Sequence, residues 1–242
     1  MTLSYDGHDL ESLLICGEPE LSILNAKPDF ANTTARNGNA FIGMRYGEST
    51  VAFTIVATGT AAERRGKFST LGSWLMVDAP KQLILPDTPD RYYLAVPQGS
   101  LDLQRGFDGE YAVLTFTLTD PIAYSVTESS AVTLLNYAYV TFTVGGNAPT
   151  GVRIVTSKAY GASGWWDVYA ESKSADADRI QVKINPSSSS DQQQVEIDTV
   201  NHNAGGRAVG IYSTWFEFEP GEHKIYTSNN ESVTVYWRDR WY

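Results

Sequence analysis

The stretch Leu114-Thr-Phe-Thr-Leu118 alternates apolar and polar side chains with a period of two. In a β-strand this spacing puts Leu114, Phe116 and Leu118 on one face of a pleated sheet, where they can be buried together. The same pattern recurs at residues 51–55, 140–144, 180–184 and 233–237. Turn sequences rich in glycine, asparagine and aspartate separate these segments. The chain is therefore predicted to be mainly β, with antiparallel strands in stacked layers.

One segment departs from this pattern and predicts a single helix over residues 61–77. Thr60 and Glu63 have the spacing of a capping box, in which the two side chains satisfy backbone N–H groups at the start of a helix. Phe68, Leu71 and Leu75 follow at helical spacing, and Trp74 flanks them. Pro80 then stops the helix. We expect the apolar side of this helix to pack against a sheet.

The composition predicts a folded, acidic protein. Of the 242 residues, 42% are hydrophobic and 19% are charged, so the chain has enough apolar material for a sizeable core. The formal net charge is −10, and no basic stripe is present that could displace the counterions of phosphates. We therefore expect no specific binding of DNA or RNA.

The single cysteine and the hydropathy pattern indicate the cellular compartment in which the protein is made. Cys16 excludes an intrachain disulfide and a multi-cysteine zinc site, and it is interpreted as a small buried hydrophobe. Residues 1–10 lack the basic start and apolar centre of a signal peptide. No segment approaches the roughly 18 apolar residues of a membrane span. We expect a protein that is made soluble in the cytoplasm and is not inserted into membranes.

Two domains are predicted, over residues 1–130 and 131–242. Asp120-Pro121 closes the first group of strands, and Gly145-Gly146-Asn147-Ala148-Pro149 opens the second. The polar run over residues 186–194 is interpreted as a solvated hairpin loop, because it lies between two clear strand patterns.

No catalytic, cofactor-binding or metal-ligating residue is predicted. The sequence lacks nucleophile-elbow, phosphate-loop, dinucleotide-binding and zinc-protease motifs. His8, His202 and His223 do not have metal-binding spacing, and we interpret them as solvated turn residues.

Paired carboxylates are the remaining route to catalysis, because the two carboxylates of a glycosidase meet only in the fold. Glu217 and Glu219 are candidates, but they alternate with two phenylalanines and fit the solvent-exposed face of a half-buried strand. Asp87 and Asp90 lie between prolines, where a turn is expected.

The dipeptide Trp165-Trp166 offers a different kind of site, because indole rings can stack on sugars. Adjacent residues in a strand point to opposite faces, so one of the two is expected in the core. The other could belong to a protein interface or to a surface on which sugar rings stack. A carbohydrate-binding β-sandwich is therefore an alternative function, and a cell-wall hydrolase is a third.

The order of several short segments resembles the distal tail protein (Dit) family of long-tailed, non-contractile bacteriophages. In the first half these segments are Ala35-Arg36-Asn37-Gly38, Tyr46-Gly47, Val51–Ile55, Arg64, Trp74-Leu75, Leu83–Asp87, Tyr92-Tyr93 and Phe116–Tyr124. In the second half they are Val195–Asp198, Phe218–Glu222 and Val235–Trp241. The resemblance covers nearly the whole chain. The second half is too compact for the arm-like insertion by which some members hold receptor-binding proteins.

The resemblance implies a structural, non-enzymatic tail hub. In that family an N-terminal β-sandwich with one α-helix, here residues 1–130, closes into a hexameric ring, and a C-terminal galectin-like β-sandwich, here residues 131–242, projects outward. The implied partners are five further copies of the chain, the tail tube protein, the tail-tip proteins and, in some members, receptor-binding proteins. The implied location is the tip of the virion tail, assembled in the host cytoplasm, and no cofactor is implied.

Residues 30–50 are a candidate for ring assembly, because this segment is polar and punctuated by glycines. Such a loop could reach a neighbouring subunit or line the channel, or it could be an ordinary surface loop. Arg36 and Arg45 are the residues expected to meet carboxylates of the neighbour.

Overall fold

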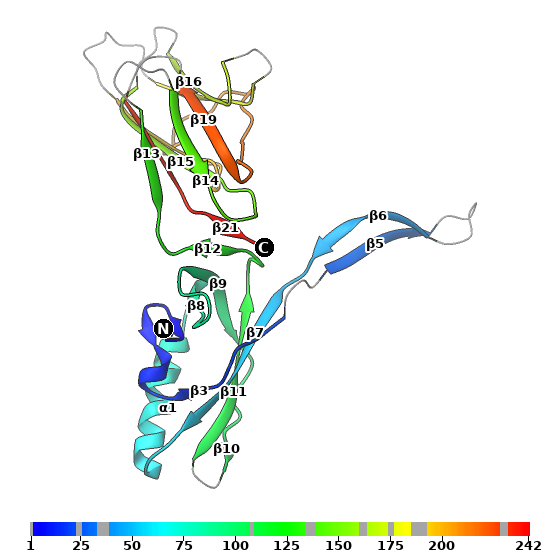
Figure 1. The fold of residues 1–242 in the computed structure, drawn as a ribbon, viewed down its shortest axis with the longest axis vertical. Helices are drawn as coiled ribbons and strands as arrows, with labels where there is room; N and C mark the ends of the chain where they lie inside the picture. Colours follow the sequence, from blue (N-terminus) through cyan, green and yellow to red (C-terminus); the bar gives the residue numbers. More distant parts are fainter. Residues whose placement is uncertain are drawn as a thin grey trace. The chain divides into compact units, whose positions relative to one another are not determined.

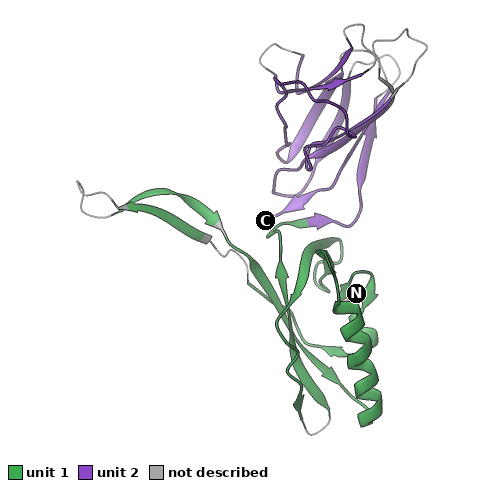
Figure 2. Ribbon diagram, turned by 180° about the vertical axis from the view of Figure 1, so that it is seen from behind, with its two compact units in different colours: residues 1–123 green, residues 124–242 purple. Residues whose placement is uncertain are grey.

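The structure is a computed structural model that describes residues 2–22, 26–32, 39–106, 109–133, 139–159, 164–173, 177–184, 193–227 and 232–242. The chain divides into two compact units, residues 1–123 and 124–242 (Figure 2). Each unit has a hydrophobic core of its own. The fold is mainly β with one α-helix, which confirms the predicted fold class. The division falls at 123/124, where the sequence predicted 130/131.

Unit 1 is built around one continuous antiparallel sheet with the strand order β2-β1-β8-β9-β11-β7-β3. In addition, β4 pairs with β7, and β10 pairs with β11. The strands are β1 Ser4–Tyr5, β2 His8–Asp9, β3 Ile15–Cys16, β4 Glu20–Leu21, β7 Ser49–Ala57, β8 Lys81–Ile84, β9 Arg91–Gln98, β10 Gln104–Arg105 and β11 Glu110–Leu118. A short 3-10 helix, Leu10–Ser12, follows β2.

The strands β7 and β11 form the centre of this sheet. They pair along their whole length, from Ala57 opposite Glu110 to Ser49 opposite Leu118. The large apolar side chains buried on the two strands are Val51, Phe53, Ile55, Leu114, Phe116 and Leu118, each at most 2% exposed. These are the residues that the alternation placed on one face, so both predicted strands are confirmed.

The helix α1, Ala61–Leu75, packs its apolar side into the same core. Its capping box is formed: the Glu63 carboxylate accepts from the Thr60 backbone N–H at 2.7 Å, and the Thr60 hydroxyl accepts from the Glu63 N–H at 3.4 Å. Leu71 is fully buried. The helix predicted over 61–77 is thus confirmed, two residues shorter at its end. In the described part of the chain, no helix is long and apolar enough to cross a membrane.

The strands β5 (Ala26–Asn32) and β6 (Asn39–Tyr46) form a two-stranded sheet of their own (Figure 1). Their hydrogen-bonded partners are each other and not the strands of the main sheet. Residues 33–38 between them are outside the described residues.

The chain passes from unit 1 to unit 2 within β12 (Ala123–Ser125). Unit 2 is a sandwich of two four-stranded antiparallel sheets, ordered β13-β20-β15-β18 and β14-β19-β16-β17. The strands are β13 Ser129–Val132, β14 Tyr139–Val144, β15 Val152–Ala159, β16 Trp165–Ala170, β17 Arg179–Lys183, β18 Gln193–Asp198, β19 Gly221–Thr227 and β20 Val233–Trp237. The short strand β21, Arg240–Trp241, is in neither of these sheets and pairs with β12. Both sheets contribute side chains to one core, in which Trp166 is the largest fully buried residue.

Candidate functional site

The three histidines do not form a catalytic or metal-binding group. His202 lies in a turn, as predicted, whereas His8 lies in the strand β2. Each of the two stacks on a tryptophan ring, with ring centroids 4.5 Å apart for His8 and 5.1 Å apart for His202. His223 corrects the sequence prediction of a solvated turn residue: it lies in β19, its side chain is 15% exposed, and its Nδ1 lies 2.6 Å from a carboxylate oxygen of Glu171. Among the described residues, no three His, Cys, Asp or Glu side chains gather closely enough to hold a metal ion.

The candidate carboxylates are arranged as surface groups. Glu217 and Glu219 are exposed, and the phenylalanines between which they alternate are buried, as the pattern predicts. Their segment is not a strand, which corrects the prediction of a half-buried strand; an isolated bridge joins Phe218 to Thr150. Glu217 pairs with Arg240 at 3.1 Å. Asp87 and Asp90 lie in turns after β8, also as predicted.

A depression of about 610 Å³ in unit 1 is lined by residues that include Cys16, Glu11, Glu18 and Asp87. Cys16 is half-buried, where the sequence predicted a buried residue. Burial, with smaller contributions from the Glu11 and Asp9 carboxylates, raises the pKa of the Cys16 thiol to about 11. The thiol therefore stays protonated near neutral pH and is a poor nucleophile.

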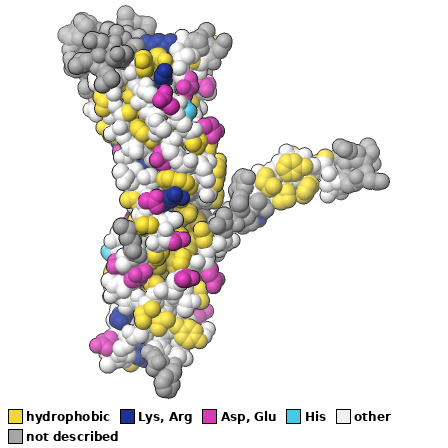
Figure 3. Space-filling model, viewed as in Figure 1, with side chains coloured by type: hydrophobic (Ala, Val, Ile, Leu, Met, Phe, Trp, Pro, Cys, Tyr) yellow, Lys and Arg dark blue, Asp and Glu magenta, His cyan; other side chains and the backbone are white. Residues whose placement is uncertain are grey.

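The β5–β6 hairpin exposes large apolar side chains. Phe30, Phe41, Ile42 and Met44 are 54%, 60%, 68% and 46% exposed. Figure 3 shows hydrophobic side chains gathered on this hairpin. An apolar surface of this kind on a folded protein marks a contact site, because leaving it in water costs free energy.

The register of the hairpin explains why these side chains gather. The strands pair from Ala26 opposite Tyr46 to Asn32 opposite Asn39, and Phe30 lies opposite Phe41. The two phenyl rings meet edge to face, with centroids 6.1 Å apart. The register shifts at Phe30, so that Ile42 has no partner on the opposite strand.

The central sheet of unit 1 also leaves apolar side chains exposed. The side chains of β7 and β11 that point away from the core include Val56 and Tyr111, which lie opposite each other, and Ile15 on β3 lies beside Val56. Ile15, Tyr111 and Val113 are 61%, 38% and 55% exposed. Unit 1 thus carries two exposed apolar surfaces, the hairpin and this strip.

The segment that the sequence proposed for ring assembly has a different surface chemistry from the polar one expected. Residues 30–50, predicted as a polar loop, include most of the hairpin. Arg36 is outside the described residues. Arg45 already has a partner within the hairpin, because its Nη2 lies 2.6 Å from an Asp29 carboxylate oxygen. The apolar run Phe41-Ile42-Gly43-Met44 was the sequence signal that could have identified the exposed side chains.

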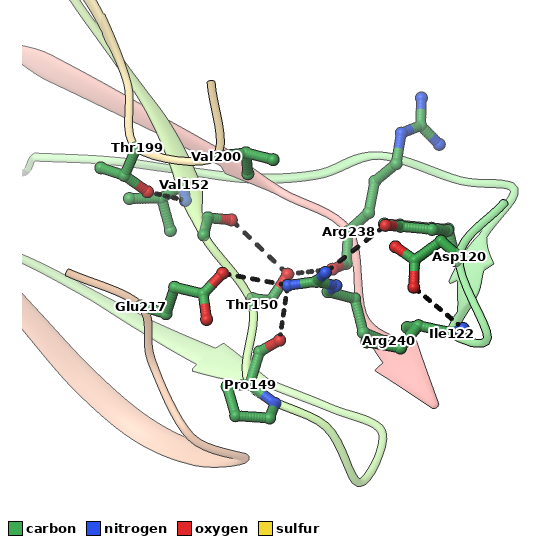
Figure 4. Close-up of polar contacts among 12 residues, drawn as sticks. Asp120, Ile122, Pro149, Thr150, Val152, Thr199, Val200, Glu217, Arg238 and Arg240 are labelled. Carbon is green, nitrogen blue, oxygen red and sulfur yellow. Dashed lines mark hydrogen bonds and ion pairs between the residues drawn. The ribbon is translucent and has the colours of Figure 1, made fainter. Parts of the chain in front are cut away.

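Hydrogen bonds hold the C-terminal segment of unit 2, which contains Arg238 and Arg240, in place (Figure 4). Nη1 of Arg240 donates to the carbonyl of Pro149 at 2.9 Å and to the Glu217 carboxylate at 3.1 Å. The hydroxyl of Thr150 donates to the Arg238 carbonyl at 2.7 Å. Each bond ties the segment to backbone or to a surface carboxylate, so the arrangement is structural.

The chain was compared with known families, curated proteins and solved structures. No family model and no curated protein sequence matches it. The crystal structure of SPP1 Dit matches with a TM-score of 0.80, covering 100% of this chain and 99% of that chain at 16% sequence identity. The chain has the fold of a phage Dit protein. The resemblance predicted from the sequence is confirmed at the level of fold.

A second match comes from the structure of the phage P2 baseplate in its activated conformation with Ca. It has a TM-score of 0.53 and 10% identity, covering 96% of this chain and 92% of that chain. The SPP1 protein is described as a paradigm of the hub adsorption apparatus in phages that infect Gram-positive bacteria.

Proposed function

We propose that this chain is a structural protein of a phage tail, the distal hub at the tail tip. Six copies close into a ring that joins the tail tube to the tail-tip or baseplate proteins and to the receptor-binding apparatus. The proposal is supported by the Dit fold over the full length of the chain and by the baseplate protein that shares it. It assigns no catalysis to the chain.

The main observation in support of the proposed ring is the pair of exposed apolar surfaces in unit 1. A ring needs a head-to-tail contact, in which one surface of a subunit meets a different surface of the next. The β5–β6 hairpin supplies one such surface, and the strip of Ile15, Tyr111 and Val113 supplies a second. Fully burying an exposed large apolar side chain contributes about 1.5–3 kcal/mol, and the four hairpin side chains, which are about half exposed, can each contribute roughly half of that to such a contact.

Solution mass tests the proposal most directly. Six copies of the 26.6 kDa chain have a mass of about 160 kDa, and we expect that species by multi-angle light scattering. Negative-stain images of it should show a hollow six-fold particle. A chain that stays monomeric at every concentration, both alone and with tail proteins, would contradict the proposal.

A further inference from the structure

The outward face of the β14-β19-β16-β17 sheet in unit 2 has an unusual composition. The buried side chains of these strands alternate with outward-facing positions that carry four aromatic, three basic, two acidic and three uncharged polar residues, and no aliphatic residue. These positions are Tyr139, Thr141, Thr143, Trp165, Asp167, Tyr169, Arg179, Gln181, Lys183, Glu222, Lys224 and Tyr226. In the view of Figure 3, hydrophobic, basic and acidic side chains are intermixed over unit 2.

The register arranges the aromatic residues in a row across the sheet. Tyr139 lies opposite Tyr226, Tyr226 opposite Tyr169, and Tyr169 opposite Arg179. The rings of Tyr139 and Tyr226 are 5.2 Å apart. Because neighbouring strands are about 4.8 Å apart, the three tyrosines span roughly 10 Å, and the row including Arg179 spans roughly 14 Å. It can therefore contact several ring units of an extended ligand at once.

The three cations of this face lie over its aromatic rings. The distances to the ring centroid are 4.8 Å for Lys183 over Trp165, 5.5 Å for Lys224 over Tyr139 and 6.0 Å for Arg179 over Tyr169. Over the described part of the chain, none of the three has a carboxylate within ion-pair distance. On the opposite sheet Arg153 pairs with both Glu128 and Glu196, at 3.1 and 3.7 Å. The three cations are thus not held in ion pairs with described residues, and with the two carboxylates of the face they leave it a formal charge of 3 − 2 = +1 in a protein of net charge −10.

A rigid turn at the edge of the face adds two exposed side chains. A 3.0 Å hydrogen bond between its first and last residues closes the turn over residues 210–213. Hydrogen bonds to the carbonyls of Arg179 and Gln181, at 2.8 and 2.9 Å, hold the segment against β17. Ile211 and Tyr212 at the tip are 89% and 76% exposed. Large apolar side chains that are held rigid in water favour a ligand at this edge.

We propose that this face binds an anionic polysaccharide. The aromatic rings stack on the C–H faces of the sugar rings, and Arg179, Lys183 and Lys224 meet carboxylate, sulfate or phosphate groups along the chain. A protein partner fits less well, because charged residues are depleted from the centres of protein interfaces. The inference goes beyond the tail-hub proposal and does not rest on it.

The test uses the full-length protein on a panel of uronate, sulfated and glycerol-phosphate glycans with matched neutral glycans. We expect an anionic glycan to bind with a Kd on the order of a millimolar or tighter. Tyr169→Ala combined with Tyr226→Ala should weaken that binding roughly tenfold. Lys183→Gln combined with Lys224→Gln should weaken it roughly fivefold and reduce its salt dependence.

The matched control is Tyr236→Ala, because Tyr236 lies on the outward face of the opposite sheet under a similar cation, Arg153, at 4.0 Å. Its binding should equal that of the unmodified protein. If the double tyrosine variant fails to fold, the lysine variant carries the test alone. Absence of binding to every anionic glycan would overturn the inference. Equal or tighter binding to oligo-dT or to polyglutamate would also overturn it. The tail-hub proposal is tested separately, by the mass of the particle in solution.

Discussion

The β5–β6 hairpin of unit 1 and the outward face of the β14-β19-β16-β17 sheet of unit 2 are both exposed surfaces built on strands. The hairpin exposes phenylalanine, isoleucine and methionine, and its Arg45 is paired with Asp29. The sheet face carries tyrosine, tryptophan and unpaired cations, with no aliphatic residue. The hairpin side chains gain free energy only by leaving water, which favours another protein surface. The sheet face keeps its polar atoms hydrated, which favours a polar ligand.

Trp166→Ala tests whether the two surfaces belong to separately stabilised units. Trp166 is fully buried in the core of unit 2, so we expect a loss of about 3–5 kcal/mol from the unfolding free energy of that unit. Glycan binding should be lost, whereas unit 1 has its own core and should keep the particle mass. Denaturant unfolding followed by circular dichroism, together with light scattering, measures both effects.

The neighbouring Trp165→Ala is the control, because Trp165 faces outward and is not part of the buried core. It should cost much less stability. Loss of the particle in Trp166→Ala would show that the two units do not fold separately.

Phe30→Asp combined with Phe41→Asp tests the role of the hairpin. Truncating a central interface residue costs about 2 kcal/mol or more, so the association constant should fall roughly 30-fold or further. The melting temperature of the monomer should change little, because both side chains are exposed. Concentration-dependent light scattering measures the association.

Val132→Asp is the matched control for the hairpin variant, because Val132 is 53% exposed on a strand of unit 2 and Phe30 is 54% exposed. It should leave the mass unchanged. Equal losses in the two proteins would assign the effect to added charge and not to the hairpin.

Thr60→Ala has the smallest expected effect, since it removes the cap of α1 and leaves both exposed surfaces intact. We expect a loss of about 1 kcal/mol in the stability of unit 1. Ser69→Ala, an exposed change within the same helix, is the control and should be nearly neutral. Thermal unfolding distinguishes the two variants.

The cap also predicts a pH dependence. Hydrogen bonds from the backbone and the hydroxyl of Thr60 lower the pKa of Glu63. A lowered pKa in the folded state means that the contribution to stability is present above the usual pKa of a glutamate and is lost as the pH falls through the folded value. The stability difference between the unmodified protein and Glu63→Gln should therefore shrink in acid; a difference that grows would contradict the cap.

Much of the fold could be predicted from local patterns. The alternation in 51–55 and 114–118 identified the central strands, and the capping box identified the start of α1. The opposite faces of Trp165 and Trp166 also followed from the period of two. The hairpin was missed as an apolar surface, because a run such as Phe41-Ile42-Gly43-Met44 looks the same in a sequence whether it is buried or exposed. The role of His223 was missed because its partner Glu171 is distant in the sequence.

The amino-acid sequence by itself determined the central strands, the helix and the alternation of inward and outward side chains along those strands, because these depend on neighbours within a few residues. Only the tertiary structure decided which outward side chains meet. Tyr139, Tyr169 and Tyr226 form one row because pairing between strands far apart in the chain sets their register. Phe30 and Phe41 stay exposed because β5 and β6 pair with each other and no described strand covers them. Register and coverage depend on long-range contacts, which a local pattern does not contain.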